Sequence, residues 1–295
     1  MSDLLTRHRN GSLRYLRGGE GPPLLLLHGA PGSARSWLGA GRLLTSHYDV
    51  IVPDLQGFGA SEPADNPLHL DHALYVEAHA DTVYHLLDHL KVDTLFLGGH
   101  NFGGLLALTL LRLFPDLSVR GLALASSAPF AKVNRPFLLR MAAVPLLGRA
   151  ALWTAFGTRP GLRLLYRIAV QNRIAFPRPD FDRHLTPSSL RHTRRIFQRR
   201  LVGPNDPYRD AEVLLSELEI PTIVLWGDRD PLQTVDTAAR LVEILPNATL
   251  SIFDNTGHFV PEERPEMTAW HMDDFFRAQS PSKEAPRSNH HRSSF

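Results

Sequence analysis

The 295-residue chain contains no cysteine. This absence excludes disulfide bonds, a thiolate nucleophile and any cysteine-ligated metal site. Long apolar runs are also missing, and a stretch such as "PPLLLLH" at 22–28 is too short to cross a bilayer. The amino-terminal "MSDLLTRHRNGS" has no apolar core for export. The sequence therefore predicts a cytoplasmic protein that does not act at a membrane.

Lysine is nearly absent, and arginine carries most of the positive charge. We interpret this as codon bias toward GC-rich DNA, which indicates a bacterial source. The net charge is only +2, although one basic cluster, "RHTRRIFQRR" at 191–200, resembles a nucleic-acid-binding segment. Because no aromatic-rich binding surface accompanies it, the cluster predicts an amphipathic helix with Ile196 inward and no nucleic-acid partner.

Motifs for metals and cofactors are absent too. His85 and His89 have a spacing that can bind zinc, but no third ligand is evident nearby, so a solvated helix face is predicted. The glycine-rich stretches lack the lysine of a phosphate-binding loop. We therefore expect neither a metal ion nor a cofactor.

Short apolar runs alternate with longer helical patterns along the chain. The runs are rich in Leu, Val and Ile and are bounded by Gly, Pro or Asp, as buried parallel strands are. They are predicted at 24–27, 49–52, 94–98, 121–125, 222–226 and 249–253, after an edge strand in "SLRYLRGG". Helices are predicted at 71–90, 103–114, 234–245 and 262–278. This alternation predicts an α/β fold, a mainly parallel sheet flanked by helices.

One interval breaks the alternation. Residues 129–208 show helical patterns, Pro and Gly breaks and many aromatic residues, but no convincing strand. We predict a helical cap there, inserted into a core formed by residues 1–128 and 209–280. Such a cap would cover the carboxyl ends of the strands, where open α/β sheets bind ligands. The polar, Pro- and Ser-rich segment 281–295 is predicted to be a disordered tail.

The stretch "GGHNFGG" at 98–104 lies between a predicted strand and an apolar helix. A strand, a Gly-flanked turn and a helix in this order are the setting of a nucleophile elbow, and residue 101 is its tip. The residue there is Asn101, and a carboxamide is both a poor nucleophile and a poor base.

In these features the chain, from about residue 10 to 278, resembles the α/β-hydrolase superfamily. Four further motifs carry the resemblance in the expected order: "HGAPGS" (28–33), "PDLQGFGASEP" (53–63), "WGDRDP" (226–231) and "NTGHFVPEERPE" (255–266). The resemblance implies that His258 is the general base and that Asp230, rather than the rival Asp228, orients it. It also implies an oxyanion hole formed by the backbone N–H groups of Ala30 and Phe102. The His-Gly-x-Pro loop further predicts a cis bond between Ala30 and Pro31.

Within the superfamily, "GHNFGG" is most similar to the Gly-His-Asp-Phe/Trp-Gly-Gly pattern of the epoxide hydrolases. Asn101 would then replace the aspartate nucleophile. The segment "GPNDPYRD" at 203–210 resembles one that carries an epoxide-activating tyrosine, which makes Tyr208 a predicted ring-oxygen donor; Tyr166 is a candidate for a second. The residues predicted to line the substrate site are His28, His100, Trp153, Tyr166 and Tyr208.

Three interpretations remain open from the sequence. The first is an epoxide hydrolase-like enzyme acting on an apolar small molecule, with its covalent route disabled by Asn101. The second is a non-covalent acid/base enzyme of secondary metabolism (a lyase, a cyclase or a direct-water hydrolase) that uses His258 and Asp230. The third is an inactive hydrolase homologue that binds a ligand. A monomer or homodimer is expected in each case.

Overall fold

The computed structural model describes residues 6–10, 13–62, 72–127, 154–202 and 211–279. Its eight strands form one sheet in the order β1-β2-β4-β3-β5-β6-β7-β8. The strands are β1 (Thr6–Asn10), β2 (Leu13–Gly18), β3 (Pro23–Leu27), β4 (Asp49–Asp54), β5 (Thr94–His100), β6 (Ser118–Ala125), β7 (Thr222–Gly227) and β8 (Ala248–Phe253). The pairs formed by β1 with β2 and by β2 with β4 are antiparallel, and the others are parallel. The predicted α/β class with a mainly parallel sheet is confirmed.

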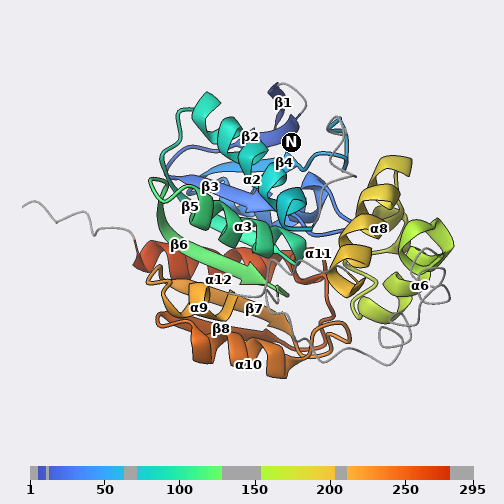
Figure 1. Cartoon of the computed structure of the whole chain (residues 1–295). Helices are drawn as coiled ribbons and strands as arrows, with labels where there is room; N and C mark the ends of the chain where they lie inside the picture. Colours follow the sequence, from blue (N-terminus) through green and yellow to red (C-terminus); the bar gives the residue numbers. More distant parts are fainter. Residues whose placement is uncertain (1–5, 11–12, 63–71, 128–153, 203–210, 280–295) are drawn as a thin grey trace, which may run out of the picture.

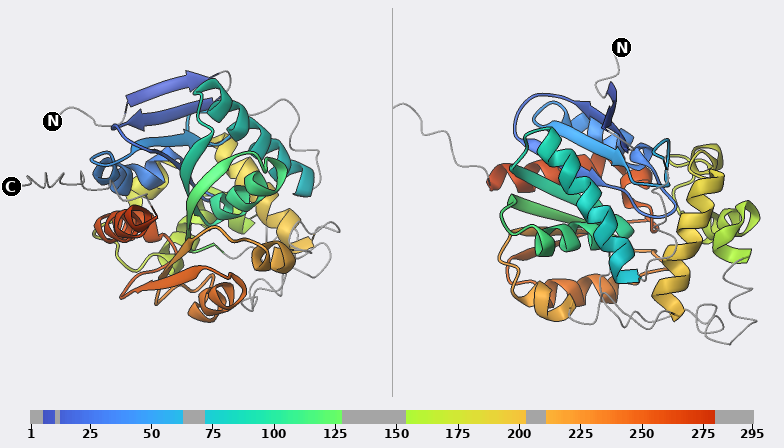
Figure 2. Two further views of the ribbon diagram at one scale, coloured as in Figure 1. Left: turned by 90° about the vertical axis from the view of Figure 1, so that its left-hand side faces the viewer. Right: turned by 45° about the horizontal axis from the view of Figure 1, so that its top comes forward.

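Helices cover both faces of this sheet (Figure 2). They are η1 (Ala34–Trp37), α1 (Leu38–Leu44), α2 (His72–His89), α3 (Phe102–Leu113), α6 (Arg159–Ala169), α7 (Arg178–Asp182), α8 (Pro187–Val202), α9 (Ala211–Ser216), α10 (Val235–Ile244), α11 (Val260–Glu263) and α12 (Pro265–Ala278). All six apolar runs predicted as strands and all four predicted helices are present. The strand predicted at the edge, in "SLRYLRGG", is β2, and the edge prediction is wrong because β2 lies between β1 and β4. No helix in the described ranges is long and apolar enough to cross a membrane.

Two hydrophobic clusters explain why the strands look uniformly apolar. Alternate residues of one strand enter different clusters: Leu25 and Leu27 pack on the face covered by α2, α3 and α10, whereas Leu24 and Leu26 pack toward α1 and α12. All four leucines are completely buried. A strand buried on both faces needs apolar residues at every position, which removes the alternation typical of half-exposed strands.

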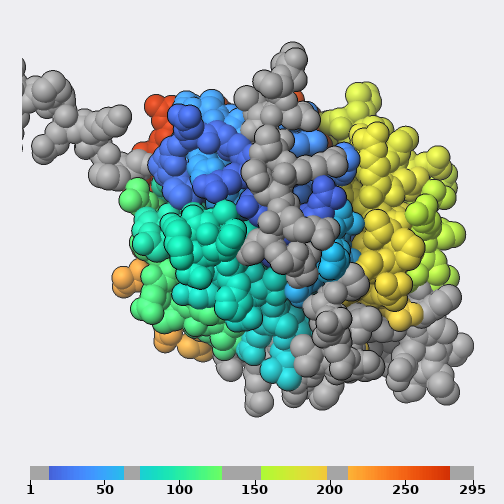
Figure 3. Space-filling view, turned by 90° about the horizontal axis from the view of Figure 1, so that it is seen from above, coloured from blue at the N-terminus to red at the C-terminus, as the bar shows by residue number. Residues whose placement is uncertain are grey.

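Residues 154–202, between β6 and β7, contain helices and no strand (Figure 1). Their aromatic side chains form a third cluster around Tyr166, Phe176 and Phe181, which also includes Phe259. Seen from above, this helical segment lies to one side of the core (Figure 3). Ile196 on α8 is buried, as the amphipathic pattern predicts. The remainder of the predicted cap, 129–153 and 203–208, and the predicted tail, 281–295, lie outside the described residues.

The strand β1 was not among the predicted strands. Its sequence, "TRHRN", is polar throughout, and it pairs only with β2 at the edge of the sheet. A strand in that position is held by backbone hydrogen bonds and does not need an apolar face. The pair Asn10–Gly11, which favours a tight hairpin turn, was the available signal.

Candidate active site

Asn101 occupies a sharp turn between β5 and α3. Its backbone has φ 50° and ψ −111°, in a region that residues with a side chain seldom adopt. Glycines make the turn possible: a Cβ on Gly103 would overlap the carbonyl oxygen of Leu27, and one on Gly104 would overlap the side chain of Ser127. The turn therefore places residue 101 at the carboxyl edge of the sheet, between β3 and β6.

The carboxamide of Asn101 is hydrogen-bonded at both ends. Its Oδ1 accepts the backbone N–H of Phe102 at 2.7 Å, and its Nδ2 lies 2.9 Å from Nε2 of His258. The Phe102 N–H was predicted to be an oxyanion-hole donor, and here it is occupied by the side chain at the tip of the turn. Gly29 precedes Ala30, the predicted second donor, and packs against the Cβ atom of Asn101. A Cβ atom added to Gly29 would lie only 2.9 Å from the Cβ atom of Asn101.

The His258 ring is fixed by Asp230. Nδ1 of His258 lies 2.7 Å from Oδ2 of Asp230, and both side chains are almost fully buried. The other carboxylate oxygen of Asp230 accepts the backbone N–H groups of Leu232 and Gln233. The carboxylate thus accepts a hydrogen bond from Nδ1–H, so the proton of the neutral ring is on Nδ1 and Nε2 faces Asn101 without one.

The rival carboxylate, Asp228, is used elsewhere. Its Oδ1 accepts the backbone N–H of Thr256 at 3.0 Å, and its Oδ2 lies 3.8 Å from Arg229. Its role is therefore to join the loop after β7 to the loop after β8. The structure brings Asn101, Asp230 and His258 together in one chain of hydrogen bonds.

Two predicted substrate-site histidines hold the backbone instead. Nδ1 of His28 donates to the carbonyl of Gly29, and its Nε2 accepts the N–H of Leu55, so neither ring nitrogen remains for a ligand. Nε2 of His100 lies 2.9 Å from the carbonyl oxygen of His258, while its Nδ1 is buried. Burial lowers the pKa of His28, and burial followed by the His258 charge lowers the pKa of His100 to about 3. Both imidazoles are neutral near pH 7.

The predicted tyrosines and Trp153 are placed differently. The hydroxyl of Tyr166 donates to the carbonyl of Phe176 at 2.7 Å within the third cluster, so a buried structural bond already uses it. Tyr208 and Trp153 lie outside the described residues. The Ala30–Pro31 bond is cis, as predicted.

Sequence reasoning missed Glu263, which is 1% exposed. Its carboxylate accepts four backbone N–H groups, those of Gln171, Asn172, Gly257 and Phe259, at 2.8 to 3.2 Å. Two of these donors flank His258, and two follow α6 in the helical segment. The backbone N–H of His258 also donates to Ala169 at 2.8 Å. Glu263 therefore joins the loop that carries His258 to residues 169–172. The motif "GHFVPEERPE" was the only sequence signal for this role.

Two more histidines, also missed, attach the helical segment to the core. Nδ1 of His184 lies 3.0 Å from Oγ of Ser33, in the loop before η1, and Nδ1 of His192 lies 2.7 Å from the hydroxyl of Tyr75 on α2. Burial is the largest cause that lowers the pKa of His184 to about 3 and that of His192 to about 4. These neutral imidazoles hold the helical segment beside the carboxyl edge of the sheet.

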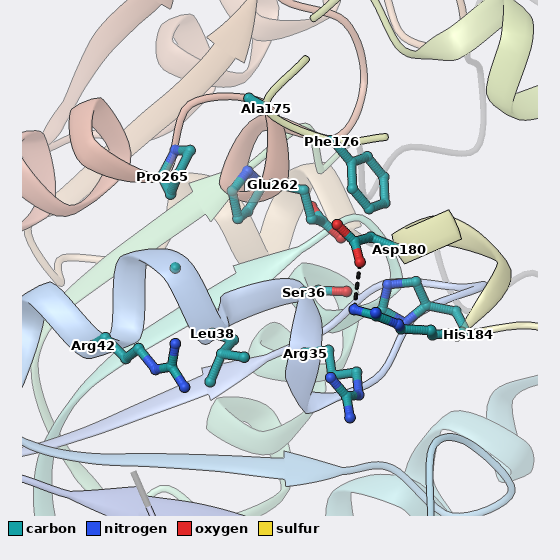
Figure 4. A pocket seen from close by; sticks show the side chains of 13 residues that line it. Arg35, Ser36, Leu38, Arg42, Ala175, Phe176, Asp180, His184, Glu262 and Pro265 are labelled. Carbon is teal, nitrogen blue, oxygen red and sulfur yellow. Dashed lines mark hydrogen bonds and ion pairs between the residues drawn. The ribbon is translucent and has the colours of Figure 1, made fainter. Parts of the chain in front are cut away.

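A separate pocket of about 250 Å³ lies between η1 and α1, residues 175–184, and the start of α11 and α12 (Figure 4). Its lining includes Arg35, Ser36, Asp180, Arg183 and Glu262, and Asp180 pairs with Arg183 across one side. None of Asn101, Asp230 and His258 lines this pocket. Among the described residues, no group of three His, Asp or Glu side chains is arranged to hold a metal ion.

Comparisons with known proteins agree with the fold. The family model described as "alpha/beta hydrolase fold" matches residues 22–265. The 2-hydroxymuconate semialdehyde hydrolase of Pseudomonas putida is 30% identical, with 87% of this chain and 88% of the relative covered. The soluble epoxide hydrolase of Corynebacterium sp. (strain C12) is 27% identical, with 90% and 95% covered. A putative lipase from Acinetobacter baumannii AYE has the same fold, with a TM-score of 0.77 at 23% identity over 93% of this chain and 91% of that chain.

Proposed function

The chain belongs to the α/β-hydrolase fold family, and from that premise we propose that it is an epoxide hydrolase-like enzyme acting on an apolar small molecule beneath a helical cap. The observation that carries the proposal is the continuous chain Asp230–His258–Asn101, with hydrogen bonds of 2.7 and 2.9 Å. An imidazole that a carboxylate orients, next to the nucleophile position, is the arrangement that activates water. The similarity to a soluble epoxide hydrolase supports the choice of substrate class.

The residue at the turn decides which route is open. In a covalent route, a carboxylate at position 101 would open the epoxide and form an ester, and water activated by His258 would hydrolyse it. A carboxamide cannot form that ester, so the covalent route is disabled as long as residue 101 is asparagine. Asn101 is nearly isosteric with aspartate, and the site keeps its shape for substrate.

The remaining groups supply electrostatic help and binding. The N–H groups of Ala30 and Phe102 would stabilise an oxyanion, once a reacting oxygen takes the place that Asn101 Oδ1 now has. Tyr208 would donate to the epoxide oxygen from the part of the cap outside the described residues. Trp153 and the aromatic residues of residues 129–208 would provide an apolar lining, whereas the hydroxyl of Tyr166 is bound to Phe176.

A second candidate function is a non-covalent acid/base reaction. The tautomer favours it: because Nδ1 of His258 faces Asp230, Nε2 is free of a proton and can take one directly from water or substrate. The Nδ2 group of Asn101 could then donate a hydrogen bond to a substrate oxygen. Direct water attack on an epoxide, an elimination or a ring closure would all use this pair.

Three proteins compared on one panel of epoxides test these proposals: the unchanged chain, Asn101→Asp and His258→Ala. If Asn101 replaces a nucleophile, Asn101→Asp should gain turnover by orders of magnitude. If the chemistry is non-covalent, the same change should slow the reaction because it places a negative charge against a developing oxyanion. His258→Ala should then cost on the order of 10²–10⁴-fold, the usual effect of losing a general base. Tight ligand binding with no turnover by any of the three would favour the third interpretation, a binding protein.

A further inference from the structure

The orientation of the Asn101 carboxamide follows from its partners. The N–H of Phe102 needs an acceptor, and only the amide oxygen can serve, so Oδ1 must face Phe102 and Nδ2 must face His258. Nε2 of His258 is the unprotonated nitrogen because the ring proton is on Nδ1, which donates a hydrogen bond to Asp230. Nδ2–H therefore donates to Nε2, and the amide has one definite arrangement.

That arrangement is the one an enzyme imposes on an acyl group that it hydrolyses. The carbonyl oxygen rests on a backbone N–H at the start of α3, where negative charge is favoured. The leaving nitrogen lies 2.9 Å from an imidazole that can deliver a proton to it. The Cγ atom of the carboxamide is bonded to a carbonyl oxygen and to a nitrogen. In an ester at this position, the same atom would be bonded to a carbonyl oxygen and to a second oxygen. The acyl group in the site is thus a side chain of the protein itself.

We propose that Asn101 is a self-processing site at which the chain converts its own asparagine to aspartate. A water molecule adds its oxygen to Cγ while Nε2 of His258 takes one of its protons, and the resulting negative charge on Oδ1 is held by the Phe102 N–H. The C–N bond then breaks, and the proton on His258 passes to Nδ2, which leaves as ammonia. Solvent water is the only co-reactant, and no redox change occurs.

This reaction goes beyond the proposed function, because its substrate is the chain and not an epoxide. It uses the same three side chains, and its product is the carboxylate that the covalent route requires. An amide leaves more reluctantly than the alkoxide of an ester, so the conversion is expected to be a slow, single event in the life of each molecule and not a repeated turnover.

The competing chemistry is spontaneous deamidation through a cyclic imide, in which the next backbone nitrogen attacks Cγ. At residue 101 that nitrogen belongs to Phe102, which is 3% exposed and lies at the first position of α3, a rigid and crowded setting for ring closure. The two routes leave different products, because the imide opens to a mixture of isoaspartate and aspartate. In the pair Asn10–Gly11, the residue after the asparagine has no side chain that could hinder ring closure. This pair therefore provides a reference for the imide route within the same chain.

The test is peptide mapping by mass spectrometry of the full chain, incubated without any substrate in ordinary and in heavy-oxygen water. We expect the peptide containing position 101 to gain one oxygen from water and to contain aspartate without isoaspartate. His258→Ala should slow this conversion on the order of 10²–10⁴-fold, and His258→Gln should slow it as well. The Asn10 peptide should convert at the same rate in all three proteins, and thermal melting shows whether each variant is folded.

Three results would overturn the proposal: an amide that persists at position 101 while Asn10 converts, equal conversion in folded His258→Ala, or isoaspartate at position 101. The test is independent of the proposed function. Conversion without any epoxide turnover would leave this inference standing and remove the proposed function. A persistent amide, together with an active Asn101→Asp protein, would do the reverse.

Discussion

Glu263 holds His258 from both sides, because its carboxylate accepts the backbone N–H groups of Gly257 at 3.1 Å and of Phe259 at 3.2 Å. The same carboxylate accepts two N–H groups after α6, each at 2.8 Å. One buried side chain thus determines where the loop that carries His258 lies and joins it to the helical segment. Glu263 touches no reacting atom and is a positioning residue.

The first prediction concerns this carboxylate. Glu263→Gln replaces one of its two accepting oxygens with an NH₂ group that faces backbone donors. Leaving buried N–H groups without an acceptor costs about 1–3 kcal/mol, so the free energy of unfolding should fall by that amount. In an Asn101→Asp background, kcat should fall more than KM rises, because the change displaces His258 and not the substrate. Urea unfolding and epoxide kinetics measure the two effects.

Glu266→Gln is the matched control, since Glu266 is an exposed glutamate in the first turn of α12. This substitution should change the free energy of unfolding and the kinetic constants no more than substitutions at exposed positions usually do. Equal stability and activity of the Glu263 and Glu266 variants would contradict the positioning role.

The second prediction concerns the glycines of the turn. Gly103→Ala adds a methyl group that overlaps the carbonyl of Leu27, a backbone atom of a central strand that cannot move aside. Overpacking of this kind costs about 1–3 kcal/mol or more, and the turn should shift enough to separate Asn101 from His258. Gly157→Ala is the control, because its new Cβ would meet only the flexible side chain of Arg194 at 3.0 Å. Melting temperatures that are equal for the two variants would contradict this explanation.

The third prediction separates the two carboxylates after β7. In an Asn101→Asp background, Asp230→Asn should lower kcat by on the order of 10⁴, the effect of giving the base histidine the wrong tautomer in a triad of this kind. Asp228→Asn should keep most of the activity, since its Oδ1 can still accept the N–H of Thr256. A larger loss for Asp228→Asn than for Asp230→Asn would reverse the assignment.

The central sheet could be predicted because strands buried on both faces have a signature that does not depend on tertiary detail. Leu24 to Leu27 are apolar at every position because both faces of β3 are covered. The hydrogen-bonding partners of single side chains carry no such signature. Glu263 appears in the sequence as one of several glutamates near a loop, and only the fold brings residues 171 and 172 within reach of it.

The same limit explains the histidines. His28 and His100 precede the two glycine-containing turns of the site, which made substrate contact a reasonable expectation. Both ring nitrogens of His28 are instead hydrogen-bonded to backbone groups, those of Gly29 and Leu55. Nε2 of His100 is hydrogen-bonded to the backbone carbonyl of His258. A motif gives the position of a residue along the chain, whereas the direction of its side chain depends on which loops pack against it.

The last prediction concerns pH and Glu262, which lines the separate pocket. Burial raises the pKa of Glu262 to about 8 from an ordinary value of 4.5, although Ser36 donates a hydrogen bond that opposes the shift. Between these two values the folded protein retains a proton that the unfolded chain has lost. The stabilisation from this protonated carboxyl is therefore complete below pH 4.5 and is lost as the pH rises through about 8. The free energy of unfolding should fall across this interval by up to about 1.4 kcal/mol per pH unit.

Glu262→Gln, which keeps a neutral side chain of the same size, should flatten that slope and raise the stability above pH 8 relative to the unchanged protein. Urea unfolding at several pH values, with Glu266→Gln as the control, measures the slope directly. A slope that is the same in the unchanged protein and in Glu262→Gln would show that Glu262 is ionised in the folded state.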